Sequence, residues 1–251
     1  MAPEKEDGPD PQSACLGLIA AMRQKIASKQ DVEILGKKFI LLPEVFDPSF
    51  TPGPSAFNAE EVLKIIKNEA DKASGNQFNV LNIGAGAGHI AVMAALSAKN
   101  CHVLATDLNA AAVQNITENA ALHRVEDRVK VGTGTVFQVP EIQGQKFDLI
   151  FWVYPCTFGE SFIAQSSGLE RALLDPNYEG LRSYLSGARQ FLKETGKMLI
   201  VFSHAFGRGD EFQKILKENK WETEVRAKAA FPLPIAPIDV DFSVLELLNR
   251  A

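Results

Sequence analysis

Cysteine is scarce in this sequence, and its three copies, Cys15, Cys101 and Cys156, lie far apart. Their number is odd and no Cys-x-x-Cys pair occurs, so the sequence predicts neither a disulfide framework nor a zinc site. Reduced thiols of this kind are typical of a cytosolic protein. The four histidines also lack the spacing of metal ligands, and we expect no metal.

Long apolar runs and an excess of basic residues are missing as well. No stretch approaches the roughly 20 apolar residues that cross a bilayer, and residues 1–12 contain no apolar signal core. We therefore expect a cytoplasmic protein without a membrane partner, and we leave the nucleus open as a second compartment. Lys and Arg total 26 against 31 Asp and Glu. Because phosphate binding needs a basic face, we do not expect a nucleic-acid partner.

The 251 residues suffice for one full domain and a modest extension. Residues 1–12 are acidic and Pro-rich, which predicts a disordered tail. Residues 13–57 read as an N-terminal cap that contains a helix from Ser13 to about Ser28, a hairpin and a Pro- and Phe-rich loop. Residues 58–251 form the main domain.

Strand and helix patterns alternate through the main domain. We expect helices at 59–73, 90–98, 110–123, 178–194 and 210–219, and strands at 78–83, 101–105, 129–131, 147–152, 197–203, 221–227 and 241–248. This alternation predicts an α/β fold, a Rossmann-like doubly wound sheet of seven mostly parallel strands. The last two strands have only a Pro-rich connection, so the last strand should return antiparallel at the edge of the sheet.

A glycine-rich loop, Gly84-Ala-Gly-Ala-Gly88, joins the first strand of the main domain to a helix. Glycines permit a sharp turn and a close approach to a ligand, and a helix N-terminus adds free N–H groups. A nicotinamide fingerprint would be G-x-G-x-x-G, but position 89 is His. A nicotinamide oxidoreductase is therefore a poorer interpretation. The alternative without a ligand is that the loop is only a tight turn between a strand and a helix.

Asp107 ends the second strand, 23 residues after Gly84. An acid at this place accepts hydrogen bonds from both ribose hydroxyls of a bound adenosine. Its structural alternative is to cap the helix that starts near Ala110. The glycine loop upstream favours the ribose role.

These segments resemble the cofactor half of class I S-adenosylmethionine-dependent methyltransferases. Phe147 to Cys156 falls where one branch, which includes the release-factor glutamine methyltransferases, carries an Asn-Pro-Pro-Tyr signature. The Pro-rich segment 42–52 and the segment 175–181 also resemble that branch. The resemblance implies S-adenosylmethionine as cofactor, held by Asn82, Gly84, Ala85, Gly86, Gly88, Asp107, Leu108, Thr135 and Val136.

Three positions depart from the family pattern. Asn82 replaces the acid usual before the glycine loop, and Thr135 replaces the acid that usually meets the adenine amino group. Val153 replaces the signature Asn, whose side chain accepts hydrogen bonds from the target N–H groups in the family. Valine cannot accept a hydrogen bond. Either the target nitrogen is held differently here, or the methylated atom is of another kind.

The resemblance places the methyl acceptor beside Val153, Tyr154, Pro155 and Cys156. Phe50, with its neighbours Phe46 and Phe57, forms either a lid over the substrate or simply the core of the cap. Tyr154 and His204 are the candidate general bases, because His204 follows a strand at the sheet edge where ligands bind. The alternative for His204 is a loop histidine with backbone partners.

The sequence thus predicts a methyltransferase that acts on a small-molecule or protein acceptor, with a nitrogen acceptor favoured. The alternative is a catalytically degenerate S-adenosylmethionine-binding partner protein, because three motif positions are altered. The sequence leaves the oligomeric state open.

Overall fold

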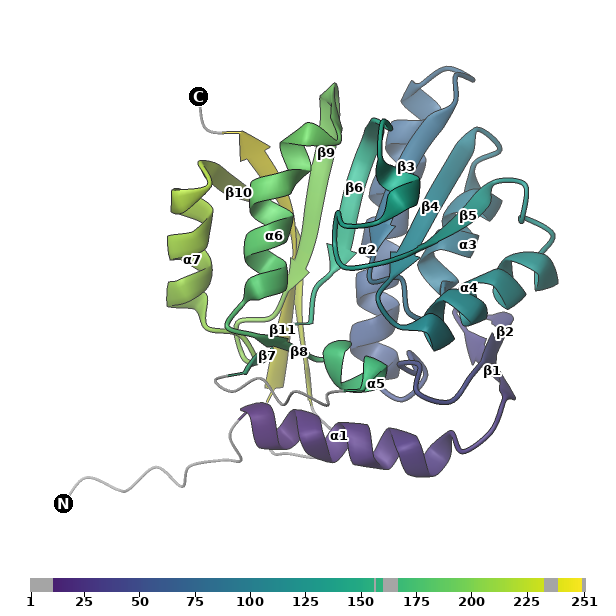
Figure 1. Ribbon diagram of the computed structural model, residues 1–251, viewed down its shortest axis with the longest axis vertical. Helices are drawn as coiled ribbons and strands as arrows, with labels where there is room; N and C mark the ends of the chain where they lie inside the picture. Colours follow the sequence, from purple (N-terminus) through teal and green to yellow (C-terminus); the bar gives the residue numbers. More distant parts are fainter. Residues whose placement is uncertain (1–10, 156, 160–166, 233–238, 250–251) are drawn as a thin grey trace.

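A sheet of seven strands forms the central layer of the computed structural model, which describes residues 11–155, 157–159, 167–232 and 239–249. The strands are β3 (Phe78–Ile83), β4 (Cys101–Asp107), β5 (Val129–Thr133), β6 (Phe147–Val153), β9 (Leu192–Phe202), β10 (Trp221–Pro232) and β11 (Asp239–Asn249). Their order is β10-β11-β9-β6-β3-β4-β5 (Figure 1). Strands β3, β4, β5, β6 and β9 run parallel, and β11 is antiparallel to both neighbours.

This arrangement confirms the predicted Rossmann-like α/β fold and its antiparallel last strand. The expected place of that strand was wrong, because β11 lies between β9 and β10 and not at the edge. A long pairing explains this position: β11 hydrogen-bonds to β10 from Trp221 to Pro232 and to β9 from Met198 to Phe202.

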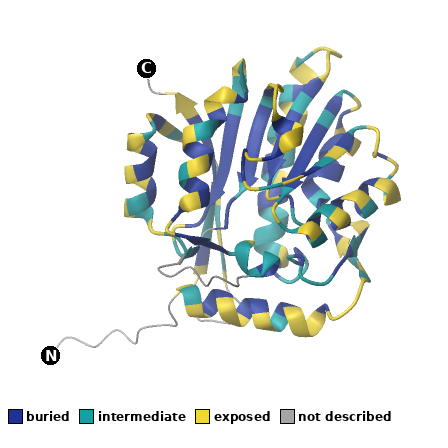
Figure 2. Ribbon diagram, in the orientation of Figure 1, coloured by how far each residue is buried: buried dark blue, intermediate teal, exposed yellow. Residues whose placement is uncertain are grey.

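Helices cover both faces of the sheet, as a buried parallel sheet requires. One face carries α2 (Pro52–Lys72), α3 (His89–Ser97) and α4 (Ala110–Leu122); the other carries α6 (Glu179–Gly187), α7 (Gly209–Glu218) and the short turn η1 (Pro140–Ile142). Alternate residues of β6 supply the two cores: Leu149 and Phe151 join the first, and Ile150 and Trp152 join the second. The central strands β3, β4 and β6 are accordingly almost entirely buried (Figure 2).

The N-terminal cap consists of α1 (Pro11–Lys25) and a hairpin of β1 (Gln30–Ile34) and β2 (Lys37–Leu41). Helix α1 begins two residues inside the expected tail and stops three residues early; the rest of that tail, residues 1–10, lies outside the described residues. Helix α2 crosses the expected boundary after residue 57, because Pro52 is well placed as the first helical residue. The division into tail, cap and main domain stays a prediction.

Two buried amides fix the hairpin to the main domain. Asn119 accepts a hydrogen bond from the Ile40 N–H (2.7 Å) and Asn115 accepts one from the Leu42 N–H (2.8 Å). The Asn119 amide also donates to the carbonyl of Ala87 in the glycine loop (2.9 Å). The cap is therefore tied to α4 and to the glycine loop at once.

Three short elements follow β6 that the sequence did not predict: β7 (Thr157–Gly159), α5 (Gly168–Arg171) and β8 (Leu174–Pro176). The helix expected at 178–194 was wrong in its second half. It ends at Gly187, a short turn η2 (Ala188–Gln190) follows, and Leu192 already pairs with Phe147 of the sheet. Within the described ranges, no helix has the length and apolarity to span a bilayer.

Candidate active site

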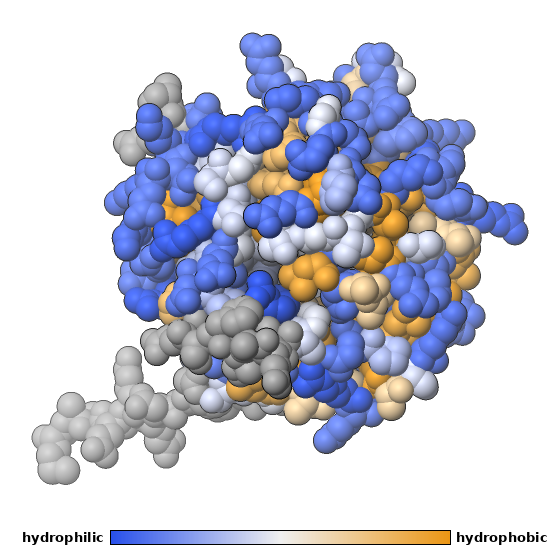
Figure 3. Space-filling model, viewed as in Figure 1, coloured by the Kyte–Doolittle hydropathy of each residue, from blue (hydrophilic) through white to orange (hydrophobic). Residues whose placement is uncertain are grey.

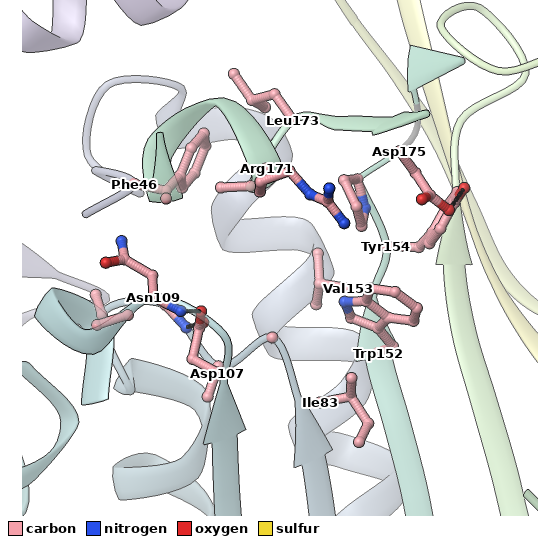
Figure 4. A pocket seen from close by; sticks show the side chains of 18 of the residues that line it. Phe46, Ile83, Asp107, Asn109, Trp152, Val153, Tyr154, Arg171, Leu173 and Asp175 are labelled. Carbon is pink, nitrogen blue, oxygen red and sulfur yellow. Dashed lines mark hydrogen bonds between the residues drawn. The ribbon is translucent and has the colours of Figure 1, made fainter. Parts of the chain in front are cut away.

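A cavity opens at the carboxyl ends of β3, β4 and β6, where ligands bind in sheets of this type. Its walls come from the glycine loop, the ends of β4 and β6, and the loop at 134–136. Figure 4 shows Asp107 and Asn109 on one side of it and Trp152, Val153 and Tyr154 on the other. On the outer surface, apolar side chains gather over the middle of the face in view, inside a largely hydrophilic border (Figure 3).

Asp107 holds the glycine loop in shape. Its Oδ2 accepts a hydrogen bond from the backbone N–H of Gly86 (2.9 Å), and its Oδ1 accepts one from the N–H of Asn109 (2.9 Å). Burial raises the pKa of the Asp107 carboxyl, and these backbone hydrogen bonds act against that rise. Each oxygen keeps a further lone pair for a ligand donor.

The three glycines of the loop share a left-handed backbone, with φ of +57° at Gly84, +56° at Gly86 and +77° at Gly88. Their surroundings differ. A Cβ on Gly84 would lie 2.6 Å from Nε1 of Trp152, and a Cβ on Gly88 would lie 3.0 Å from Cα of Ile116. A Cβ on Gly86 would meet nothing within 4 Å. Gly84 and Gly88 thus permit close packing, whereas Gly86 leaves room for a ligand.

Most of the predicted cofactor residues line this cavity, namely Gly84, Ala85, Gly86, Asp107, Leu108, Thr135 and Val136. Two do not. The Asn82 amide is buried and donates to the carbonyl of Ile83 (3.1 Å), and Gly88 packs α3 against α4. These two residues support the loop from behind.

The predicted acceptor segment also reaches the cavity: Val153, Tyr154 and Pro155 line it. Cys156 lies outside the described residues. Phe50 is absent from the described wall and packs instead near α1, with the Lys25 ammonium 5.5 Å from its ring centre. Phe46, and not Phe50, lines the cavity.

Tyr154 is held by a buried carboxylate. Its hydroxyl donates to Oδ2 of Asp175 (2.7 Å), which also accepts from the N–H of Leu181 (2.9 Å), while Oδ1 accepts from the N–H of Gly180 (3.0 Å). Burial raises the pKa of Asp175, and these donors oppose the rise. The arrangement fixes the end of β6 to the first turn of α6, so it suits a positioning role better than proton abstraction.

The structure does not bring His204 to the cavity. Its side chain is exposed and its ring lies edge-on to Phe202, with ring centres 5.1 Å apart. A strand end places a residue near the correct edge of the sheet, but in the turn after Ser203 it is Phe206 and not His204 that lines the cavity.

Many residues of the cavity wall had no predicted function, among them Asn58 of α2, His89 of α3, Trp152 and Arg171. His89 was placed in the first turn of its helix without a function. Trp152 adjoins the signature segment, and that position was the available signal. Nothing in the sequence pattern marks Asn58 or Arg171.

The N-terminal cap contributes Cys15 and Leu18 of α1 to the lining of the cavity. The Cys15 thiol is within hydrogen-bond distance of the Thr157 hydroxyl (2.8 Å). At the outer end of α1, Arg23 bonds to Glu44 (2.8 Å) and to Glu170 of α5 (3.3 Å). Helix α1 is therefore attached near one end to β7 and near the other end to α5 of the main domain.

A sheet of this order, with a glycine loop after β3 and an acid after β4, defines a class I S-adenosylmethionine-dependent methyltransferase. The residues present fit that cofactor. Asp107 has lone pairs that ribose hydroxyls would reach from the cavity, a side chain at Gly86 would meet open space, and Leu108, an apolar side chain that is 41% exposed, lines the same cavity. The chain belongs to the methyltransferase-domain family, whose model matches residues 74–229.

Curated relatives agree with this assignment. The chain is 33% identical over 147 residues to a bifunctional methyltransferase of Rickettsia conorii, a match covering 53% of this chain and 26% of that protein. It is 23% identical over 231 residues to a release factor glutamine methyltransferase of Bacillus cereus, covering 80% of this chain and 78% of the other. The chain thus spans about a quarter of the length of the bifunctional relatives.

Solved structures share the fold. A SAM-dependent methyltransferase from Agrobacterium tumefaciens superposes with a TM-score of 0.56 at 14% identity, covering 89% of this chain and 71% of the other. Trm5b from Pyrococcus abyssi also gives 0.56, at 17% identity, covering 88% of this chain and 56% of the other. At such identities the likeness concerns the fold alone.

Proposed function

We propose that this chain is an active enzyme that transfers the methyl group of S-adenosylmethionine to a nitrogen atom of a small-molecule acceptor. One observation carries the proposal: Asp107 with its glycine loop and the segment 153–155 line the same cavity. A cofactor that rests on Asp107 and Gly86 would reach toward the end of β6.

Support for a nitrogen acceptor comes from the relatives named release factor glutamine methyltransferase, among them one of Aquifex aeolicus, 38% identical over 91 residues, which cover 36% of this chain and 30% of that protein. Support for a small acceptor comes from the residues of the N-terminal cap that cover the cavity. Cys15 and Leu18 of α1, with Phe46, lie over the cavity, so a bulky protein substrate would have to displace an anchored helix.

The residues have separate parts in this scheme. Asp107 would accept hydrogen bonds from the ribose of the bound cofactor, and Thr135 and Val136 would border its adenine. When bound, S-adenosylmethionine would offer an electrophilic methyl carbon to the lone pair of the acceptor nitrogen, with the electrons of the S–C bond left on sulfur and the acceptor proton released to water. Tyr154, fixed by Asp175, and Pro155 align the acceptor, and alignment alone contributes much of the rate in such displacements.

The second candidate is a cofactor-binding partner protein without catalysis. Val153, which lacks the hydrogen-bond acceptor of the family signature, favours it. Two measurements separate the candidates. Isothermal titration with S-adenosylhomocysteine should show micromolar binding in either case, and its absence would refute both. Transfer of labelled methyl from S-adenosylmethionine to the low-mass fraction of a cell extract should occur only with an enzyme. Label that appears solely in proteins would refute the small acceptor.

A further inference from the structure

Two polar side chains in the cavity wall have buried atoms without a hydrogen-bond partner: Oδ1 of Asn58 on α2 and Nδ1 of His89 on α3. Asn58 is only 5% exposed. Buried polar groups in folded proteins nearly always have partners, because an unpaired one destabilises the fold. A group without a protein partner in a cavity wall is available to bond with whatever fills the cavity, a ligand or water.

Both residues line the same cavity as Val153, the altered signature position. Val153 packs against the apolar cluster that contains Ala59, the residue after Asn58, and Ile90, the residue after His89. Trp152, one position earlier, belongs to the cluster on the opposite face of the sheet.

Asp107 lies at the end of β4 and Val136 in the loop after β5, and both line the cavity. They form the adenosine end of the proposed cofactor site. Asn58 and His89 come instead from α2 and α3, the helices on the face of the sheet against which Val153 packs.

The chemistry of Asn58 matches what Val153 lacks. A target nitrogen with attached hydrogens needs an acceptor oxygen, which a valine cannot provide and an asparagine amide does. His89 complements it, since burial lowers its pKa to about 4, so that the imidazole is neutral at physiological pH and one ring nitrogen can accept a hydrogen bond.

We propose that Asn58, from α2, supplies the hydrogen-bond acceptor for the target nitrogen that the family signature would place at position 153, with His89 beside it as a second polar contact. This inference rests on the proposed function and makes Asn58 a specificity-determining residue for N–H-bearing acceptors. The Asn58 side chain carries the same amide group as the signature Asn, but it comes from α2 and not from the end of β6.

The test needs no knowledge of the natural acceptor, because three defined ligands probe three parts of the cavity. 5′-Methylthioadenosine carries the adenosine end alone, S-adenosylhomocysteine adds the amino-acid end, and sinefungin adds an amine where the transferred methyl would lie. Binding of each is measured by isothermal titration. The readout is the ratio of sinefungin affinity to S-adenosylhomocysteine affinity.

Asn58→Leu, which keeps the volume and removes the polar atoms, should lower that ratio at least tenfold and leave S-adenosylhomocysteine binding within threefold. Asn58→Asp should raise the ratio, since a carboxylate accepts from an ammonium more strongly. Adding Val153→Asn to Asn58→Leu should restore the ratio by returning the amide to the signature position. Thermal melting of each variant without ligand checks folding, and if Asn58→Leu does not fold, Asn58→Asp alone decides.

Other outcomes overturn the inference. Equal losses for sinefungin and S-adenosylhomocysteine, with 5′-methylthioadenosine unaffected, would place Asn58 at the amino-acid end of the cofactor. Unchanged binding of all three ligands would make Asn58 a structural residue. An unaltered protein that binds none of the three would instead refute the proposed function.

Discussion

Two glycines of the loop, Gly86 and Gly88, allow the cofactor site to be separated from the fold that supports it. Both have left-handed backbones, so alanine at either position carries the same local strain. A methyl group at Gly86 would enter open space in the cavity wall, whereas one at Gly88 would press on Cα and Cγ1 of Ile116, each at 3.0 Å. We expect Gly86→Ala to act on ligand binding and Gly88→Ala to act on stability.

The magnitudes follow from these contacts. An L-residue in the left-handed region costs about 1–2 kcal/mol, so Gly86→Ala should lower the free energy of unfolding by about that amount. Gly88→Ala adds overpacking against the backbone of α4, which typically costs about 1–3 kcal/mol more. For a domain of this size each kcal/mol lowers Tm by roughly 2–4 °C. Gly88→Ala should thus melt several degrees below Gly86→Ala.

The matched control is Gly75→Ala, at φ +85° in the turn after α2, where a Cβ also meets nothing within 4 Å. Urea unfolding should give Gly75→Ala and Gly86→Ala similar stabilities. Titration with S-adenosylhomocysteine should separate them, with Gly86→Ala weakened about 10–100-fold because its methyl fills ligand space, on the scale of about 1–3 kcal/mol for overpacking. If Gly86→Ala binds as tightly as Gly75→Ala, the cavity does not hold the cofactor and the reasoning fails.

Three further predictions test single residues. Asp107→Ala should weaken S-adenosylhomocysteine binding by about 1–3 kcal/mol, since a charged acceptor is lost; unchanged affinity in the titration would place the ribose elsewhere. Asp175→Ala should destabilise the fold by about 2–4 kcal/mol, because three donors lose their acceptor. Tyr154→Phe removes one of these hydrogen bonds and should cost only about 1 kcal/mol. Equal losses of stability in urea unfolding would contradict the positioning role of Asp175. Burial lowers the pKa of His89 from 6.5 to about 4 in the folded protein. As the pH falls, His89 of the unfolded chain is therefore protonated before His89 of the folded protein, and the unfolded state gains stability. The stability contributed by neutral His89 is therefore complete above pH 6.5 and lost toward pH 4, by about 3 kcal/mol at about 1.4 kcal/mol per pH unit; His89→Gln should lack this component, and parallel stability curves for the two proteins would refute it.

The meeting of the glycine loop with Asp107 was predictable, because the loop and the acid follow two neighbouring parallel strands of the sheet. A strand, a glycine loop and an acid at the next strand end fix one another's positions, and Asp107 indeed bonds to Gly86. His204 illustrates the limit of the same rule. A strand end fixes the edge of the sheet, but the direction of the loop beyond it depends on packing, here of Phe202 against Phe212.

The short elements between β6 and α6 were missed for a different reason. Strands of three residues such as Thr157–Gly159 and Leu174–Pro176 have no periodicity to read. They are stabilised by distant partners, including the Cys15 thiol beside Thr157. Asn58 and His89 escaped for a related reason, since a missing hydrogen-bond partner is a property of the folded surroundings and leaves no trace in sequence spacing.

The same two residues bear on the choice between an enzyme and a non-catalytic binding protein. Judged by sequence alone, valine in the signature argues for lost function. The structure places an amide with a buried, unpaired oxygen in the wall of the same cavity, and such an oxygen weakens the fold unless a ligand or water bonds to it. A protein that only docks onto a partner gains nothing from that arrangement, whereas an enzyme that must orient an N–H group does. The affinity ratio for sinefungin in Asn58→Leu therefore tests the origin of the altered signature: a fall that Val153→Asn reverses would mean that the acceptor contact has moved between elements and has not been lost.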